Sequence, residues 1–166
     1  MRLIVAIAAL ALPLACGGAR DDSRGATVAQ VLDGDTITLT DGRHVRLVQL
    51  DAPEENEGEC YAREAERVLA GLMPPGTDVA IETDPALDQR DRFGRILAYV
   101  LREGTNINVE LVRRGAASVW FYEGDRGRHA AELLAAAEAA TRARRGLWLA
   151  CPGTRLDPLH PIEARN

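Results

Sequence analysis

Apolar and polar residues alternate along several short stretches of the chain, as they do in half-buried β-strands. Five stretches carry this pattern or the composition typical of strands: residues 26–33, 35–40, 43–50, 77–83 and 94–101. In the second of them, Ile37 and Leu39 alternate with threonines, and Asp41-Gly42 then predicts a tight turn to the third. The pattern therefore predicts five short strands.

The period changes to that of a helix in three other stretches, residues 60–72, 108–115 and 126–145. In the first, Ala65, Leu69 and Leu72 recur at intervals of four and three residues. Gly115 and Gly146 lie where the other two should end, a position at which glycine is common. Five strands with a helix after the third predict an α+β fold that is mainly β: a five-stranded barrel of the oligonucleotide-binding (OB) type with about three helices.

The length and charge of the chain narrow the classes of protein to consider. A chain of 166 residues is long enough for one domain with a hydrophobic core. Its formal net charge of −5 argues against a protein that coats nucleic acid non-specifically, which would be basic. An enzyme that acts on nucleic acid is not excluded, because carboxylates that hold a cation make a chain more acidic.

The N-terminus has the pattern of an export signal, which we assign to residues 1–16. Arg2 precedes an apolar run from Leu3 to Leu12, which is too short for an ordinary membrane-spanning helix. Residues 14–17, LACG, resemble the lipobox of bacterial lipoproteins, in which the cysteine, here Cys16, is acylated. The alternative is simple cleavage and release. In either case we expect the protein in the bacterial cell envelope or outside the cell.

After the signal, residues 17–25 read as a polar tether and residues 26–152 as the folded domain. Residues 153–166 form a tail with several prolines, for which we predict poor order.

The three cysteines fit an exported protein. If Cys16 carries lipid, Cys60 and Cys151 remain as a pair that an oxidising compartment would join. Such a disulfide would close a loop of about 90 residues, worth up to about 4 to 5 kcal/mol in the chain-entropy description. The alternative is two unrelated buried thiols. A structural zinc site is not expected, because the sequence has no cluster of Cys and His with the required spacing.

Three stretches carry more charge than packing requires: residues 33–36, 46–54 and 91–95. Asp35, Asp51 and Glu54 offer carboxylate oxygens, which suit a hard cation such as Ca²⁺ or Mg²⁺. Arg46 and Arg95 add forked donors that match phosphate oxygens. Together these groups could hydrolyse a phosphodiester, because positive charge placed in advance stabilises the anionic transition state.

One geometric difficulty follows from the spacing of these residues. On a straight strand, Arg46 and Asp51 would point to opposite faces, with their Cα atoms about 16 Å apart. They can serve one site only if the chain bends or bulges between them. The alternation pattern does not predict such a bend.

The motifs DGDT, RLVQLDAPE, DRFGRILAYV and NVELVRRGAA, followed by a helix that runs into GLW, resemble the staphylococcal nuclease (thermonuclease) family over residues 26–150. The resemblance implies an OB-type barrel whose third strand curls. It implies that Asp35, Asp51 and the carbonyl oxygen of Ala52 bind Ca²⁺. A monomeric enzyme is expected, cleaving DNA and RNA with little sequence preference and leaving 3′-phosphate ends.

The same resemblance assigns roles in the reaction. Glu54 would position or deprotonate the attacking water, and Arg46 and Arg95 would bind the phosphate and stabilise the transition state. Two departures stand out: Ala52 replaces a frequent Thr, and Phe93 replaces a frequent Tyr.

Other interpretations remain open for these residues. Asp33, Asp35 and Asp51 could be ordinary turn residues, with Asp33 alternatively supporting the metal ligands. Glu54 could belong to a solvated acidic run, and the two arginines could be its salt-bridge partners. The stretch Trp120-Phe121-Tyr122 could stack on a base or pack in the core. For the whole protein, the alternatives to a nuclease are a catalytically silent OB-type binding module and an anchored structural domain.

Overall fold

The computed structural model of the protein describes residues 25–166. The predicted export signal, Cys16 and the predicted tether up to residue 24 lie outside the described residues. Within residues 25–166, no helix has the length and apolar character needed to cross a membrane.

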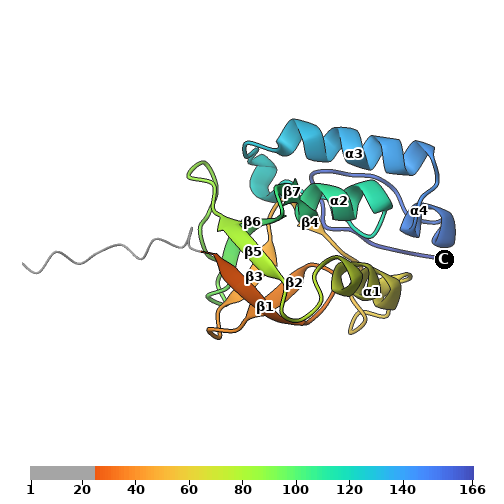
Figure 1. Ribbon diagram of the computed structural model, residues 1–166. Helices are drawn as coiled ribbons and strands as arrows, with labels where there is room; N and C mark the ends of the chain where they lie inside the picture. Colours follow the sequence, from red (N-terminus) through yellow and green to blue (C-terminus); the bar gives the residue numbers. More distant parts are fainter. Residues whose placement is uncertain (1–24) are drawn as a thin grey trace, which may run out of the picture.

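Five strands form a closed barrel (Figure 1). They are β1 (Ala26–Val31), β2 (Thr36–Leu39), β3 (His44–Leu47), β5 (Asp78–Glu82) and β6 (Ile96–Arg102). Neighbouring strands pair antiparallel in the order β3-β2-β1-β5-β6, and a parallel pairing of β3 with β6 closes the barrel. The predicted α+β fold with a five-stranded OB-type barrel is confirmed.

Short strands and helices complete the domain. The two-residue strands are β4 (Leu50–Asp51), β7 (Thr105–Asn106) and β8 (Ser118–Val119), and β4 pairs with β8. The helices are α1 (Ala62–Leu72), α2 (Ile107–Arg114), α3 (Ala130–Arg142) and the single turn α4 (Leu147–Ala150), with a 3₁₀ turn at Tyr122–Gly124. In Figure 1, α3 lies over α2, and α1 lies apart from this pair.

The predicted bounds of the longest helix, residues 126–145, are wrong at both ends. Its N-terminal residues make tertiary contacts instead: Gly127 N–H donates to Gln49 Oε1 at 3.1 Å, and Arg128 N–H donates to Asp84 Oδ2 at 2.7 Å. At the other end, Arg144 has a left-handed φ of 49°, which is incompatible with a continuing helix.

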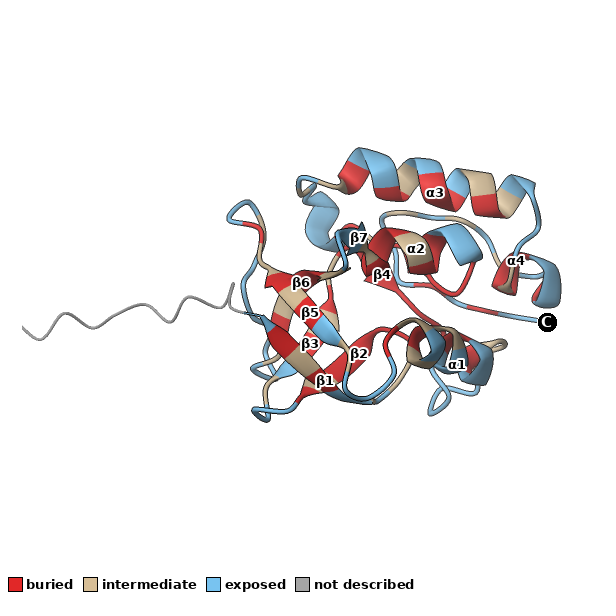
Figure 2. Cartoon of the chain, in the orientation of Figure 1, coloured by how far each residue is buried: buried red, intermediate tan, exposed pale blue. Residues whose placement is uncertain are grey.

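The core fills the barrel and the space between the barrel and the helices (Figure 2). Val28, Ile37 and Val45 face inward from the strands, as the alternation predicts. The buried Asn108 connects α2 to the barrel: its Oδ1 accepts from Val100 N–H at 3.0 Å, and its Nδ2 donates to Val48 O at 2.9 Å. This contact supports the backbone just after β3, where the candidate site begins.

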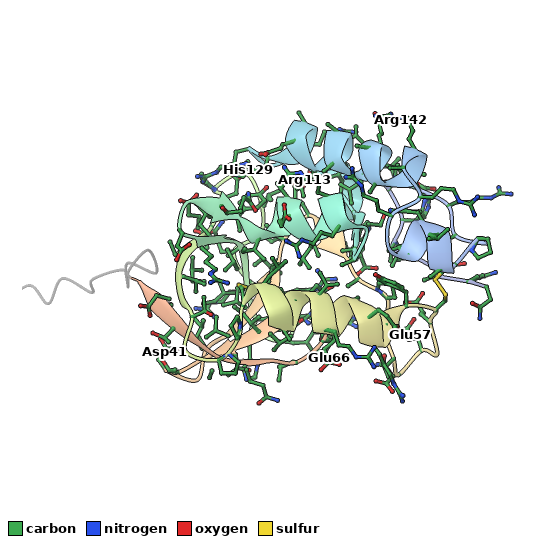
Figure 3. All side chains as sticks on the ribbon, turned by 45° about the vertical axis from the view of Figure 1, so that its right-hand side comes forward. Asp41, Glu57, Glu66, Arg113, His129 and Arg142 are labelled. Atoms are coloured by element: carbon green, nitrogen blue, oxygen red, sulfur yellow. A yellow bond between two sulfur atoms is a disulfide. The ribbon has the colours of Figure 1, made fainter. Side chains whose placement is uncertain are left out.

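The C-terminal segment (residues 152–166) is packed against the domain, so the prediction of a poorly ordered tail is wrong. A disulfide between Cys60 and Cys151, yellow in Figure 3, fixes the start of the segment, with an S–S distance of 2.04 Å. This is the pairing that the cysteine count predicts. Ile162 and Ala164 are buried near Trp148. The prolines exclude regular secondary structure here, but they do not prevent apolar side chains from packing.

Candidate active site

The bend that the candidate site requires lies between β3 and β4. Gln49 has a φ of 63°, a left-handed conformation that turns the chain after β3. The Arg46 side chain spans the bend, because its Nη1 donates to Leu47 O at 3.2 Å and to Leu50 O at 3.0 Å. As a result, Arg46 Nη2 reaches Asp51 Oδ1 at 2.6 Å. The bend thus allows Arg46 and Asp51 to meet, which a straight strand would not.

Arg46 lies between two aspartates from separate parts of the chain. Besides Asp51, its Nη2 contacts Asp35 Oδ2 at 3.1 Å. Asp35 is buried just before β2, and its Oδ2 also accepts from Ala52 N–H at 3.3 Å. Gly34 permits this close approach, because a Cβ at that position would lie 2.6 Å from the Cβ of Ala52. The structure therefore brings together three of the predicted site residues, Arg46, Asp35 and Asp51, in a largely buried cluster.

Negative charge exceeds positive charge in this cluster. Burial raises the pKa of Asp51 to about 7; Asp35 and Glu54 add to the increase, and Arg46 opposes it. Burial and the neighbouring Asp35 likewise raise the pKa of Asp33 to about 6. One guanidinium thus faces three carboxyl groups, and a further cation would stabilise their ionised forms.

Arg95 is joined to the same cluster through one hydroxyl group. Its Nη1 donates to Thr36 Oγ1 at 3.3 Å, and Thr36 Oγ1 donates to Asp35 Oδ1 at 2.9 Å. Asp91 fixes the other side of the guanidinium, with an Oδ2–Nε distance of 2.6 Å. The sequence analysis assigned no role to Asp91. Its position in a turn, four residues before Arg95, could have indicated this ion pair.

Among the predicted site residues, Glu54 is the one most weakly connected to the cluster. Its side chain is exposed on the loop after β4, and it is close enough to Asp51 to raise the pKa of that carboxyl. Among residues 25–166, no group of three or more His, Cys, Asp or Glu side chains is arranged to hold a metal ion. Glu54 therefore lies near the cluster of Asp35, Asp51 and the arginines, without forming a metal-binding group with the two aspartates.

The oxygen donors nevertheless suit a hard divalent cation. The carboxylates of Asp35 and Asp51 and the peptide carbonyl of Ala52 are the ligand types that Ca²⁺ prefers, and a cation there would stabilise the ionised form of Asp51. The predicted ligand set thus fits Ca²⁺ in its chemistry.

A pocket of about 440 Å³ lies beside the two arginines. Trp120 and Tyr122 both line it, in an edge-to-face pair with ring centroids 5.6 Å apart. The Cζ atom of Arg46 lies 5.8 Å from the centre of the Trp120 ring. Phe121, between the two aromatic residues in sequence, is fully buried in the core. The aromatic stretch therefore divides into two pocket residues and one core residue.

Phe93, the other departure from the family pattern, also lines the pocket and is 69% exposed. The guanidinium of Arg95 lies 5.5 Å from the centre of its ring, and that of Arg92 lies at 4.7 Å. This wall thus offers an aromatic surface next to positive charge, without a phenolic hydroxyl.

The barrel defines an OB-fold domain, and the cluster of Asp35, Asp51 and the two arginines marks its candidate active site. The chain belongs to the family of staphylococcal nuclease homologues, which matches residues 44–150. It is 37% identical over 138 residues to an uncharacterized endonuclease of Escherichia coli, covering 81% of this chain and 80% of the relative.

Two further relatives extend the comparison. An uncharacterized endonuclease of Haemophilus influenzae is 32% identical over 143 residues, covering 84% of this chain and 71% of the relative. Endonuclease YhcR of Bacillus subtilis is 30% identical over 136 residues, covering 73% of this chain and 11% of that much longer protein.

Proposed function

We propose that the protein is a calcium-dependent nuclease that hydrolyses phosphodiester bonds in DNA and RNA with little sequence preference and leaves 3′-phosphate ends. The observation that carries the proposal is the position of Arg46 between Asp35 and Asp51, with Arg95 joined to the same cluster through Thr36. The family, and relatives that are named endonucleases, support nuclease activity.

The two arginines supply positive charge for the transition state. When water attacks a phosphodiester, negative charge grows on oxygens that are already anionic. Arg46 and Arg95 are held in advance by Asp51 and Asp91, so little side-chain entropy is lost when they bind the phosphate. Asp35, Asp51 and the Ala52 carbonyl would hold Ca²⁺, which when bound supplies further positive charge to the phosphate and lowers the pKa of a bound water.

Glu54 is the group available to take the proton of the attacking water. Its carboxylate is exposed and lies near the cluster, so solvent and substrate can both reach it. The new P–O bond forms as the bond to the 5′ oxygen breaks; this oxygen leaves with the bonding electrons and takes a proton from solvent, and the phosphate stays on the 3′ side. Trp120 and Tyr122 line the pocket and would stack on a base, an interaction worth about 1 to 3 kcal/mol per base.

We further propose that the enzyme is exported, anchored through Cys16 or released, and acts as a monomer. The apolar segment at residues 3–12 and the Cys60–Cys151 disulfide support export, because disulfides persist mainly in oxidising compartments.

The activity is tested with purified protein and single-stranded DNA and RNA, in Ca²⁺ and in an excess of chelator. We expect cleavage only with Ca²⁺, and mass spectrometry of the products should show 3′-phosphate ends. Cleavage that continues unchanged in chelator would contradict the metal dependence. Binding without cleavage under any condition would favour the silent binding module.

The role of Glu54 is tested with the Glu54→Gln variant. Loss of a general base should lower kcat by about 10² to 10⁴-fold. Glu57→Gln is the matched control, because Glu57 is exposed on the same loop (labelled in Figure 3). If both variants retain normal kcat, Glu54 does not take the proton.

A further inference from the structure

We propose that the C-terminal segment (residues 152–166) is a positioning part of the active site, holding Asp51 and the loop that carries Glu54. This inference rests on the proposed function. The first observation is a buried hydrogen bond in which Ile162 N–H donates to Asp51 Oδ2 at 2.9 Å. The other oxygen of the same carboxylate, Oδ1, contacts Arg46. Both oxygens of Asp51 are therefore fixed by partners that lie 5 and 111 positions away in the chain.

A second pair of contacts connects the segment to the Glu54 loop. The two oxygens of the Glu59 carboxylate accept from different backbones: Oε1 from Ala164 N–H at 2.9 Å, and Oε2 from Glu54 N–H at 2.8 Å. Cys60 N–H donates in turn to Ala164 O at 3.1 Å. The backbone of Glu54 is thus joined to the segment through a single side chain.

The segment is itself well anchored. The Cys60–Cys151 disulfide fixes its start, and Ile162 and Ala164 are 7% and 4% exposed. Midway along the segment, Pro158 O accepts from Phe121 N–H at 2.7 Å, next to the two aromatic residues of the pocket. In Figure 1 the segment, in dark blue, turns back from α4 and runs past β4 before it ends at C. It therefore contacts both the carboxylate side and the aromatic side of the site.

These contacts orient a carboxylate rather than merely cover the barrel. An N–H group that binds one oxygen of a metal-binding carboxylate fixes the direction of its remaining lone pairs, and loss of such a partner typically costs about 10- to 100-fold in metal affinity or activity. Ile162 reaches the site through its hydrogen bond to Asp51, and Ala164 through the Glu59 side chain, so both residues position other groups of the site.

The test compares Ile162→Pro with Ile162→Ala in the full-length protein. Proline removes the N–H donor, whereas alanine keeps it and loses only the buried side chain. Ca²⁺ alone is titrated by calorimetry, thermal melts report folding, and kcat and KM are measured on single-stranded DNA. We expect Ile162→Pro to bind Ca²⁺ about 10- to 100-fold more weakly than Ile162→Ala and to have the lower kcat. Equal Ca²⁺ affinities in the two folded variants would overturn the inference.

A measurement on the unaltered sequence covers the case in which Ile162→Pro does not fold. In amide NMR spectra of the wild-type protein, Ca²⁺ should shift the Ile162 N–H resonance more than that of the exposed neighbour Glu163. An unchanged Ile162 resonance in protein that binds Ca²⁺ would overturn the inference alone. Wild-type protein that neither binds Ca²⁺ nor cleaves nucleic acid would instead overturn the proposed function, and this inference with it.

Discussion

Gln49 Oε1 accepts a hydrogen bond from the hydroxyl of Tyr99 at 2.9 Å, across a separation of 50 positions in the chain. The same oxygen accepts from Gly127 N–H, and Gln49 Nε2 donates to Asp125 O at 2.8 Å. One buried side chain thus fixes the bend after Arg46 against β6 and against the turn that follows the aromatic pocket residues.

Gln49→Leu should therefore destabilise the fold. The substitution leaves the Tyr99 hydroxyl, the Gly127 N–H and the Asp125 carbonyl without this partner. The Tyr99 hydroxyl is buried, and a buried unsatisfied group costs about 1 to 3 kcal/mol. We expect urea unfolding to show a loss within or above that range. In the double variant with Tyr99→Phe, the loss should be smaller than the sum of the single effects, because the two residues share a bond. Strict additivity would argue against the network.

Arg95→Met should lower kcat by about 10² to 10³-fold, since it removes positive charge aimed at the phosphate. Thermal stability should change little, because Arg95 is partly exposed. Arg142→Met is the control: that arginine lies on α3, forms an exposed pair with Glu138, and should retain full kcat. Equal kcat values for the two variants on single-stranded DNA would exclude a role for Arg95 in the reaction.

Gly34→Ala and Gly71→Ala should have opposite effects on stability. A Cβ on Gly34 would lie 2.6 Å from the Cβ of Ala52 and 3.0 Å from that of Ala65, so the Asp35 turn must shift, at a cost of about 1 to 3 kcal/mol. A Cβ on Gly71, within α1, meets nothing within 4 Å and should stabilise the helix by about 0.5 to 1 kcal/mol. Denaturant unfolding measures both. Two variants with the same stability would contradict the tight contact at Gly34.

Asp84→Asn should make the stability of the protein depend less on pH in the acid range. Burial raises the pKa of Asp84, but the N–H groups of Arg128 and Ala86 and the Arg128 guanidinium outweigh it and hold the pKa below its ordinary value. A carboxyl with a lower pKa in the folded state stabilises the protein above the unfolded pKa of about 4, and this stabilisation is lost as the pH falls through the folded pKa.

The measurement for Asp84 is the thermal midpoint between about pH 7 and pH 3. We expect the midpoint of Asp84→Asn to be lower than that of the wild type at neutral pH and to fall less on acidification. Asp88→Asn, exposed in the same loop, controls for the loss of one negative charge. An acid dependence of Asp84→Asn identical to that of the wild type would show that the folded-state contacts of Asp84 do not stabilise its ionised form.

The barrel was predictable because its signals are local. Alternation around Ile37 and Val45 and the Asp41-Gly42 turn predict strands and their neighbours without knowledge of the rest of the chain. The grouping of Asp35, Asp51 and the arginines was predictable only through the family motifs, since spacing alone placed Arg46 and Asp51 on opposite faces.

The remaining features depend on contacts between distant residues. A left-handed Gln49 has no sequence signal of its own, because glycine is the usual residue there; its conformation becomes understandable only with Tyr99 and Gly127 in place. The start of α3 was misplaced for the same reason: Gln49 and Asp84 accept from the N–H groups of Gly127 and Arg128 and so fix the backbone just before the helix. The docking of Ile162 depends on Asp51, 111 positions earlier.

The hydrogen bond from Ile162 to Asp51 also bears on how the protein is made. Its donor lies 111 positions after Asp51, so this bond cannot form until long after Asp51 has been synthesised. A chain still on the ribosome would carry the carboxylates and arginines before it carries the segment that holds one of them. The order of translation therefore places the last contact of Asp51 after the synthesis of every other predicted site residue, from Asp35 to Arg95.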